Sequence, residues 1–170
     1  MQIEPATRDD IPALLTLIHS AYRGDSAKRG WTHEADLLDG QRTDEAALTE
    51  TISDPAHLLL VAREGGALAG CVALTDKGGL GYIGLVTVDP GRQAGGLGRR
   101  LLDAAEEAAR TRFAATRAEM TVIDGRDELI AWYERRGYQL TGERRPFPAT
   151  DPRFGLPRKA LEFVVLEKSL

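Results

Sequence analysis

The sequence predicts one α/β (α+β) domain over residues 1–170, built on a mixed, mostly antiparallel sheet of about six to seven strands with helices on both faces. Strand and helix patterns alternate along the chain without an internal repeat. Glycine turns join several neighbouring strands, which favours antiparallel pairs. A chain of 170 residues with 42% hydrophobic content can form one substantial core, whereas two ordinary domains would be a tight fit.

In the N-terminal half, the sequence predicts a short strand, two helices and a pair of strands. Asp44 is a suitable N-cap for the second helix. Gly65-Gly66 is typical of a hairpin turn, because glycine tolerates positive φ at both positions. The predicted elements are a strand at 2–5, a helix from 9 to about 23, a helix that begins at 44, and strands at 58–62 and 68–74.

In the C-terminal half, the sequence predicts four strands and two helices. Gly78-Gly79 makes a turn into the first of these strands, and Gly137 closes the second helix in the left-handed cap position. The predicted elements are strands at 82–88, at 120–123, directly after Gly137 and at 161–166, and helices from about 97 and over 127–137. Segment 145–157 contains four prolines, so we expect a stiff loop there and no regular strand or helix.

The most informative stretch is Gln93-Ala94-Gly95-Gly96-Leu97-Gly98, where an apolar strand passes into a helix. The first amides of a helix lack internal partners and the helix dipole adds positive charge, so this arrangement binds phosphate. A P-loop is disfavoured because Arg99-Arg100 follow in place of Lys-Ser/Thr. A dinucleotide fingerprint is disfavoured because Leu101 stands where its third glycine is needed.

The spacing that remains, Gln/Arg-x-x-Gly-x-Gly/Ala, is met by Gln93, Gly96 and Gly98. It resembles the acyl-CoA loop of the GNAT superfamily of N-acetyltransferases. A second match is Tyr133, four residues before Gly137, as in the fourth helix of that family. The resemblance covers nearly the whole chain and implies the GNAT fold, with acetyl-CoA as cofactor. The sequence departs from the family where many members have a cofactor-contacting asparagine, because the equivalent residue is Arg126.

The resemblance also implies which residues hold the coenzyme. The glycine loop would hold the pyrophosphate, and a bulged strand that splays from its neighbour would pair its backbone with the pantetheine arm. Side chains on that strand suit ordinary burial, since these contacts are made by the backbone. The cofactor-binding residues expected on this basis are Leu85, Val86, Val88, Gln93, Ala94, Gly95, Gly96, Leu97, Gly98 and Arg99.

Acyl transfer to an amine needs a group that accepts the amine proton and a donor for the leaving thiolate. Tyr133 is the expected acid, because a phenol of pKa about 10 is protonated at neutral pH; the alternative is an ordinary core tyrosine. Glu34 is the expected base, chosen among carboxylates of a surface loop that otherwise are simply solvated. Tyr22 and Trp31 are expected to line the acceptor pocket, although packing roles suit both.

The sequence therefore predicts an N-acetyltransferase that transfers an acetyl group from acetyl-CoA to a primary amine by direct attack in a ternary complex. The alternative is a non-catalytic acyl-CoA-binding module, and a third option is a different nucleotide-binding protein. Three widely spaced histidines give no metal-ligand pattern, so we expect no metal. The acceptor is expected to be a small-molecule or peptide amine.

Charge and composition limit the classes of partner and the cellular location that the sequence favours. A formal net charge of -4 makes nucleic acid a poor partner. The lone Cys71, the N-terminal sequence without a leader pattern and the lack of a long apolar run favour a cytoplasmic protein that does not enter the membrane. The proline-rich segment 145–157 would pack over the acceptor site or over a second subunit, so a homodimer is one option.

Overall fold

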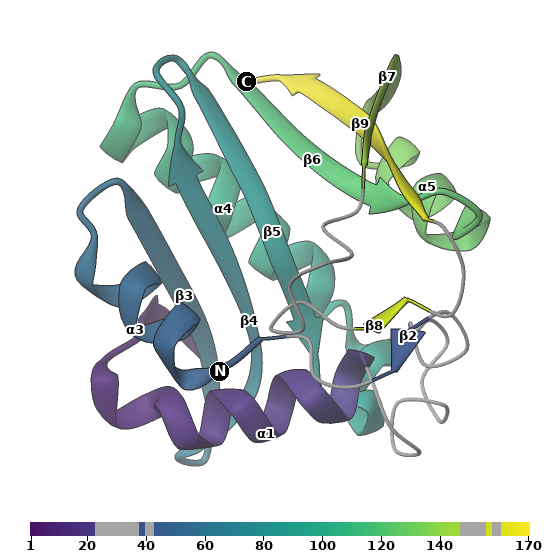
Figure 1. The fold of residues 1–170 in the computed structure, drawn as a ribbon. Coiled ribbons are helices and arrows are strands. Elements are labelled where there is room, and N and C mark those ends of the chain that lie inside the picture. Colours follow the sequence, from purple (N-terminus) through teal and green to yellow (C-terminus); the bar gives the residue numbers. More distant parts are fainter. Residues whose placement is uncertain (23–37, 40–42, 147–155, 158–160) are drawn as a thin grey trace.

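The structure is a computed structural model that describes residues 1–22, 38–39, 43–146, 156–157 and 161–170. A seven-stranded mixed sheet has the order β1-β3-β4-β5-β6-β9-β7 (Figure 1). Neighbouring strands are antiparallel, except that β5 and β6 are parallel. The strands are β1 Gln2–Pro5, β3 His57–Glu64, β4 Ala67–Asp76, β5 Leu80–Val88, β6 Arg117–Ile123, β7 Gln139–Pro146 and β9 Glu162–Ser169. The predicted fold class and strand number are confirmed.

Helices cover both faces of the sheet (Figure 1). On one face, α1 (Ile11–Tyr22) and α3 (Glu45–Ser53) pack on β3 and β4 through buried aliphatic residues such as Leu14 and Leu48. On the other face, α4 (Leu97–Phe113) and α5 (Asp127–Glu134) pack on β3 to β6, and here Leu101 and Ile130 are buried. The sheet therefore separates two hydrophobic cores, and α4 anchors the larger one.

Short-range sequence signals act as predicted. The Asp44 carboxylate accepts a hydrogen bond from the Ala47 N–H at 2.8 Å and caps α3. Gly65 and Gly66 have φ of +60° and +84° and form the turn between β3 and β4. These signals depend only on neighbouring residues, which is why the sequence reveals them.

The prediction for the proline-rich segment 145–157 was wrong at its two ends. Arg145 and Pro146 belong to β7 and pair with β9. Leu156–Pro157 forms β8, a two-residue strand antiparallel to β2 (Leu38–Asp39). Proline is tolerated because β7 lies at the edge of the sheet, where a missing N–H breaks no ladder bond. Residues 147–155 lie outside the described residues, so the predicted loop is not tested there.

Asp10 fixes the junction between β1 and α1, within the 3-10 turn η1 (Arg8–Asp10). This residue is 8% exposed, and its carboxylate accepts hydrogen bonds from the Thr7 N–H at 2.8 Å and from Arg63 Nη2 at 2.7 Å. The bond to Arg63 is the main cause that lowers the pKa of Asp10 below its ordinary value. The ionised carboxylate therefore adds stability above about pH 4, and this stability is lost as the pH falls through the lowered pKa.

Asp10→Asn is expected to lower the free energy of unfolding by about 1.5–3 kcal/mol at pH 7, because it removes the charge that Arg63 and Thr7 bind. The deficit should shrink in acid, where the wild-type carboxyl is protonated as well. Urea unfolding at pH 7 and pH 3 measures both values. Asp9→Asn, at the exposed neighbouring position, is the control. A deficit that is equal at the two pH values would contradict the assignment.

Candidate active site

β5 and β6 pair over only three positions, from Leu80–Arg117 to Tyr82–Glu119. Both strands continue beyond this point, to Val88 and Ile123, and Figure 1 shows them diverging. The hydroxyl groups of Tyr82 and Thr121 are 2.6 Å apart and form a hydrogen bond between the two strands. Beyond Tyr82, the β5 edge that faces β6 has no ladder partner in that strand. This edge can accept an extended chain.

A β-bulge interrupts β5 at Leu85. Between the pairs Cys71–Thr87 and Ala73–Gly84, one residue of β4 opposes two residues of β5. Leu85 has φ of +55°, a conformation that costs a non-glycine residue about 1–3 kcal/mol. The Thr87 hydroxyl donates to the Leu85 carbonyl oxygen at 2.9 Å and helps to hold the bulge. The bulge and the splay, both implied by the family resemblance, are confirmed.

The three expected strand residues of the coenzyme site are half-buried. Val86 and Val88 pack toward the α4 core, and Leu85 packs toward the core on the α1 face. Their side chains thus have the packing role that an ordinary strand requires. The coenzyme contacts that the family resemblance implies at these positions would be made by backbone groups and stay a prediction.

The chain leaves β5 through the 3-10 helix η2 (Pro90–Gly95), which contains Gln93 and Ala94. The Asp89 carboxylate accepts a hydrogen bond from the Gly91 N–H at 3.1 Å and caps η2. Gly96 then joins η2 to α4 with φ of +75° and ψ of +10°, a left-handed conformation that suits glycine. The predicted order of strand, glycine turn and helix is confirmed.

The N-terminus of α4 has no side-chain cap at Gly96. Its first backbone hydrogen bond runs from the Arg100 N–H to the Gly96 oxygen at 3.2 Å. The amides of Leu97, Gly98 and Arg99 precede it and lack acceptors within the helix. The Leu97 side chain is buried in the core, so this residue can contact a ligand only through its backbone. Together with the helix dipole, the three amides form a site for an anion.

Tyr133 lies in the last turn of α5 and is 6% exposed. Its ring packs edge-on against Trp132 and Tyr138, at centroid distances of 5.1 and 6.0 Å. Gly137, with φ of +98°, ends the helix, and the Tyr138 N–H donates to the backbone carbonyl oxygen of Tyr133 at 3.2 Å. The predicted spacing of helix and glycine is confirmed. Burial is also what a core tyrosine shows, so the catalytic role of Tyr133 stays a prediction.

A buried polar network holds this end of α5 against α4 and β9. Glu106 accepts hydrogen bonds from the Tyr138 hydroxyl at 2.8 Å and from Lys168 Nζ at 2.9 Å. Burial, and then the charge of Glu106, raise the pKa of Tyr138, so this hydroxyl remains protonated and acts as the donor. The network fixes the ring against which Tyr133 packs.

Of the predicted base and acceptor residues, Tyr22 alone lies within the described part of the chain. Glu34 and Trp31 lie outside the described residues, and Tyr22 is the last residue of α1. Arg126 stands at the N-cap of α5 and is 9% exposed.

In the described part of the chain, no group of three or more His, Cys, Asp or Glu side chains could hold a metal ion. Among the described helices, none is both long enough and apolar enough to span a membrane.

Sequence analysis missed a contact between the two helices beside the glycine loop. The Arg136 guanidinium lies 4.3 Å from the centroid of the Trp132 ring. A Cβ atom placed on Gly98 would lie 3.5 Å from Cζ2 of the same ring. The four-residue spacing of Trp132 and Arg136 was the available signal, since it puts neighbours on one side of a helical turn. The contact with Gly98 depends on tertiary packing.

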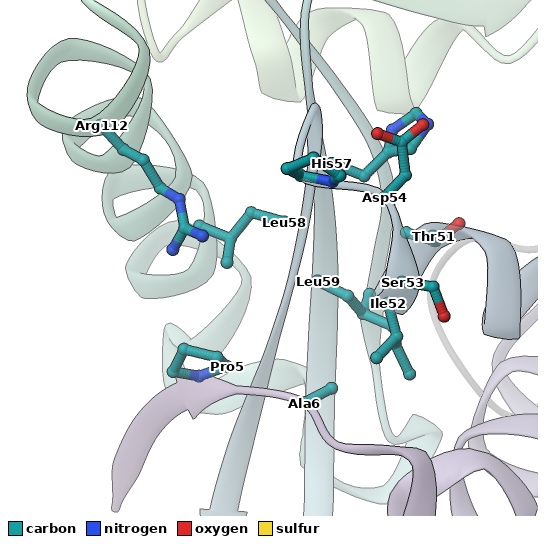
Figure 2. Close-up of a pocket in the computed structure, with 11 residues that line it drawn as sticks. Pro5, Ala6, Thr51, Ile52, Ser53, Asp54, His57, Leu58, Leu59 and Arg112 are labelled. Atoms are coloured by element: carbon teal, nitrogen blue, oxygen red, sulfur yellow. The ribbon is translucent and has the colours of Figure 1, made fainter.

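A separate pocket of about 200 Å³ lies between the C-terminal part of α4, the end of α3 and the start of β3 (Figure 2). Arg112 and Leu58 point toward one another, while His57 and Asp54 lie together on the other side. The His57 ring is 2.8 Å from Thr75 Oγ1 and 3.6 Å from Asp54 Oδ2. These polar groups are already paired, so the pocket indicates no particular ligand.

The profile of the acetyltransferase (GNAT) family matches residues 16–138, which is most of the chain. The protein therefore belongs to the GNAT family of acetyltransferases. An IAA acetyltransferase from Azospirillum brasilense is 33% identical over 101 residues, which make up 58% of this chain and 65% of that relative. The match thus spans less than two thirds of the length of the relative.

Solved structures with the same fold cover nearly the whole chain. The PaiA N-acetyltransferase from Thermoplasma acidophilum, in complex with coenzyme A, has a TM-score of 0.75 and 15% identity, over 99% of this chain and 98% of its own. yncA from Salmonella typhimurium, with its cofactor acetyl-CoA, has a TM-score of 0.70 and 20% identity, over 100% of this chain and 94% of its own. At sequence identities of 15% and 20%, the structural similarity to these two proteins establishes a shared fold and no shared substrate.

Proposed function

We propose that the protein transfers an acetyl group from acetyl-CoA to a primary amine by direct attack in a ternary complex. The observation that carries the proposal is the direct succession of the unpaired β5 edge, with its bulge at Leu85, and the uncapped N-terminus of α4 at Gly96. A coenzyme whose extended pantetheine arm leads to a pyrophosphate needs a strand edge followed by an anion site. The chain offers both in this order.

The residues present fit this coenzyme, which supplies the acetyl thioester. The amides of Leu97, Gly98 and Arg99 would donate to the pyrophosphate, because they lack acceptors within α4. The β5 edge beyond Tyr82 would exchange backbone hydrogen bonds with the amide-containing pantetheine arm. Arg126 stands at the N-cap of α5, in the position where many family members have a cofactor-contacting asparagine. The proposal assigns it no contact with the coenzyme.

Tyr133 would donate the proton that the leaving thiolate takes up, and Glu34 would accept the proton of the amine. Tyr22 and Trp31 would line the pocket of a small-molecule or peptide amine. Tyr133 comes from α5, which follows directly on β6 beyond the splay. This order of elements supports the role of Tyr133, while the roles of Glu34, Tyr22 and Trp31 rest on the family resemblance.

Acetyl-CoA at about 100 times its Kd should raise the free energy of unfolding by about 2.7 kcal/mol, a shift of several degrees in Tm. ATP and NAD should leave the Tm unchanged. Thermal unfolding with each ligand measures this, and a screen of primary amines for release of free CoA should follow. Stabilisation by ATP or NAD without any effect of acetyl-CoA would refute the proposal.

Gly96→Glu should abolish the acetyl-CoA shift, because it places a carboxylate at the anion site. Gly96→Ala is the matched control, since both variants impose a side chain on the same positive φ of +75° and only one adds a charge. The alanine variant should therefore keep most of the shift. Equal loss in the two variants would mean that backbone strain, and not charge, controls binding.

A further inference from the structure

Arg136 is a half-buried cation whose hydrogen bonds are incomplete. It follows α5 and lies over the Trp132 ring, and its Nη1 donates to the Trp132 oxygen at 3.4 Å. Its Nε is buried and has no hydrogen-bond partner among the described residues. A desolvated guanidinium with an unused donor is costly, so its retention calls for an explanation.

Two further arginines add positive charge at the same place. The pKa of Arg136 is lowered, mainly by burial and then by the charges of Arg99 and Arg135. The charge of Asp103 acts in the opposite direction. Arg99 also lies in the first turn of α4, where the helix dipole disfavours a cation. None of the three arginines makes an ion pair with a carboxylate of the described chain. By contrast, Arg110 and Arg144 each pair with an acidic side chain, at 3.2 and 2.8 Å.

Trp132 fixes the position of this cluster relative to the glycine loop. The edge of its ring lies against Gly98, with 3.5 Å between Cζ2 and the position of a Cβ, and its face supports Arg136. The unpaired cations are therefore neighbours of the amides that form the anion site of α4. Stacking on the indole also limits the motion of the guanidinium, which reduces the entropy lost when it binds a ligand.

We propose that Arg136, together with Arg99 and Arg135, binds the 3′-phosphate of the coenzyme A ribose. This inference rests on the proposed function, in which the α4 N-terminus holds the pyrophosphate. One ribose separates the two phosphate groups, so the side chain that binds the 3′-phosphate must lie beside the pyrophosphate site, as Arg136 does. A phosphate would compensate the three clustered charges and accept hydrogen bonds from guanidinium N–H groups. The cluster would thus make the protein selective for coenzyme A over dephospho-CoA.

Calorimetric titration with CoA and with dephospho-CoA tests this without any need for turnover. Wild type should bind CoA about tenfold more tightly, the effect of one charge-assisted hydrogen bond. Arg136→Gln should weaken CoA binding about tenfold and leave dephospho-CoA binding unchanged. Arg99→Gln, at an exposed position, should act in the same direction by about two- to fivefold. Arg112→Gln, an exposed arginine at the far end of α4, should change neither affinity.

Three other outcomes would contradict the 3′-phosphate site or the role of Arg136 in it. Equal affinity of wild type for the two ligands would refute the 3′-phosphate site and leave coenzyme binding intact. If Arg136→Gln weakened both ligands alike, Arg136 would only support the helix packing. If wild type bound neither ligand, the proposed function would fail together with this inference. The wild-type comparison and the Arg99 variant remain decisive even where Arg136→Gln folds poorly.

Discussion

Replacing Tyr133 with phenylalanine is expected to lower kcat by about 10²–10⁴-fold and to leave the Kd of acetyl-CoA nearly unchanged. The phenol is the proposed donor to the leaving thiolate, so its loss removes general-acid catalysis. The ring itself would remain, and with it the edge-on contacts to Trp132 and Tyr138. The substitution therefore separates proton transfer from packing, the two roles that suit a tyrosine buried in this position.

The measurement is steady-state acetylation of an amine found in the screen, beside calorimetric titration of acetyl-CoA. Tyr138→Phe is a matched control, because it removes a hydroxyl from the neighbouring ring that donates to Glu106 and to no proposed reactant. It should cost about 1.5–3 kcal/mol of stability, since Glu106 loses a donor, and should spare kcat while the protein is folded. Full activity of Tyr133→Phe would refute the acid role. A wild type that binds acetyl-CoA but acetylates no amine would favour the non-catalytic module.

Local rules explain why much of the fold could be predicted from the sequence. The hairpin at Gly65-Gly66, the cap at Asp44 and the helix after Gly96 each depend on a few neighbouring residues. The anion site could be predicted for the same reason, because its donors are the successive amides of one helical turn. The family resemblance then placed these parts in one architecture.

Features that depend on contacts distant in sequence could not be predicted in this way. Leu85 adopts positive φ against its own preference, because the pairing of β4 with β5 and the Thr87 hydroxyl impose it. Gly98 and Trp132 meet only once α4 and α5 have packed on the same face of the sheet. The pairing of β8 with β2 joins segments far apart in the chain. Tertiary context, and not local propensity, decides each of these.

Gly70→Ala is expected to lower the free energy of unfolding by about 3 kcal/mol, the upper range for overpacking a core. A Cβ at this position would lie 2.6 Å from the Thr87 carbonyl oxygen and 2.8 Å from Leu101 Cδ1. The first atom belongs to the backbone of β5 beside the bulge, and the second to the buried side of α4. The Thr87 oxygen cannot move without shifting the backbone of β5, and Leu101 Cδ1 can move only within the packed core beneath α4. Gly70 therefore sets how closely α4 approaches the strand.

Because β5 and α4 carry the two halves of the proposed coenzyme site, the same substitution should weaken CoA binding even where the protein remains folded. Chemical denaturation and calorimetric titration measure the two effects. Gly91→Ala is the control, since its nearest contact would be an ordinary 3.7 Å to Asp89 Oδ1. An unchanged unfolding midpoint in Gly70→Ala would show that α4 can shift at little cost. Loss of stability with unchanged CoA affinity would show instead that the strand edge and the helix N-terminus bind the coenzyme independently of their spacing.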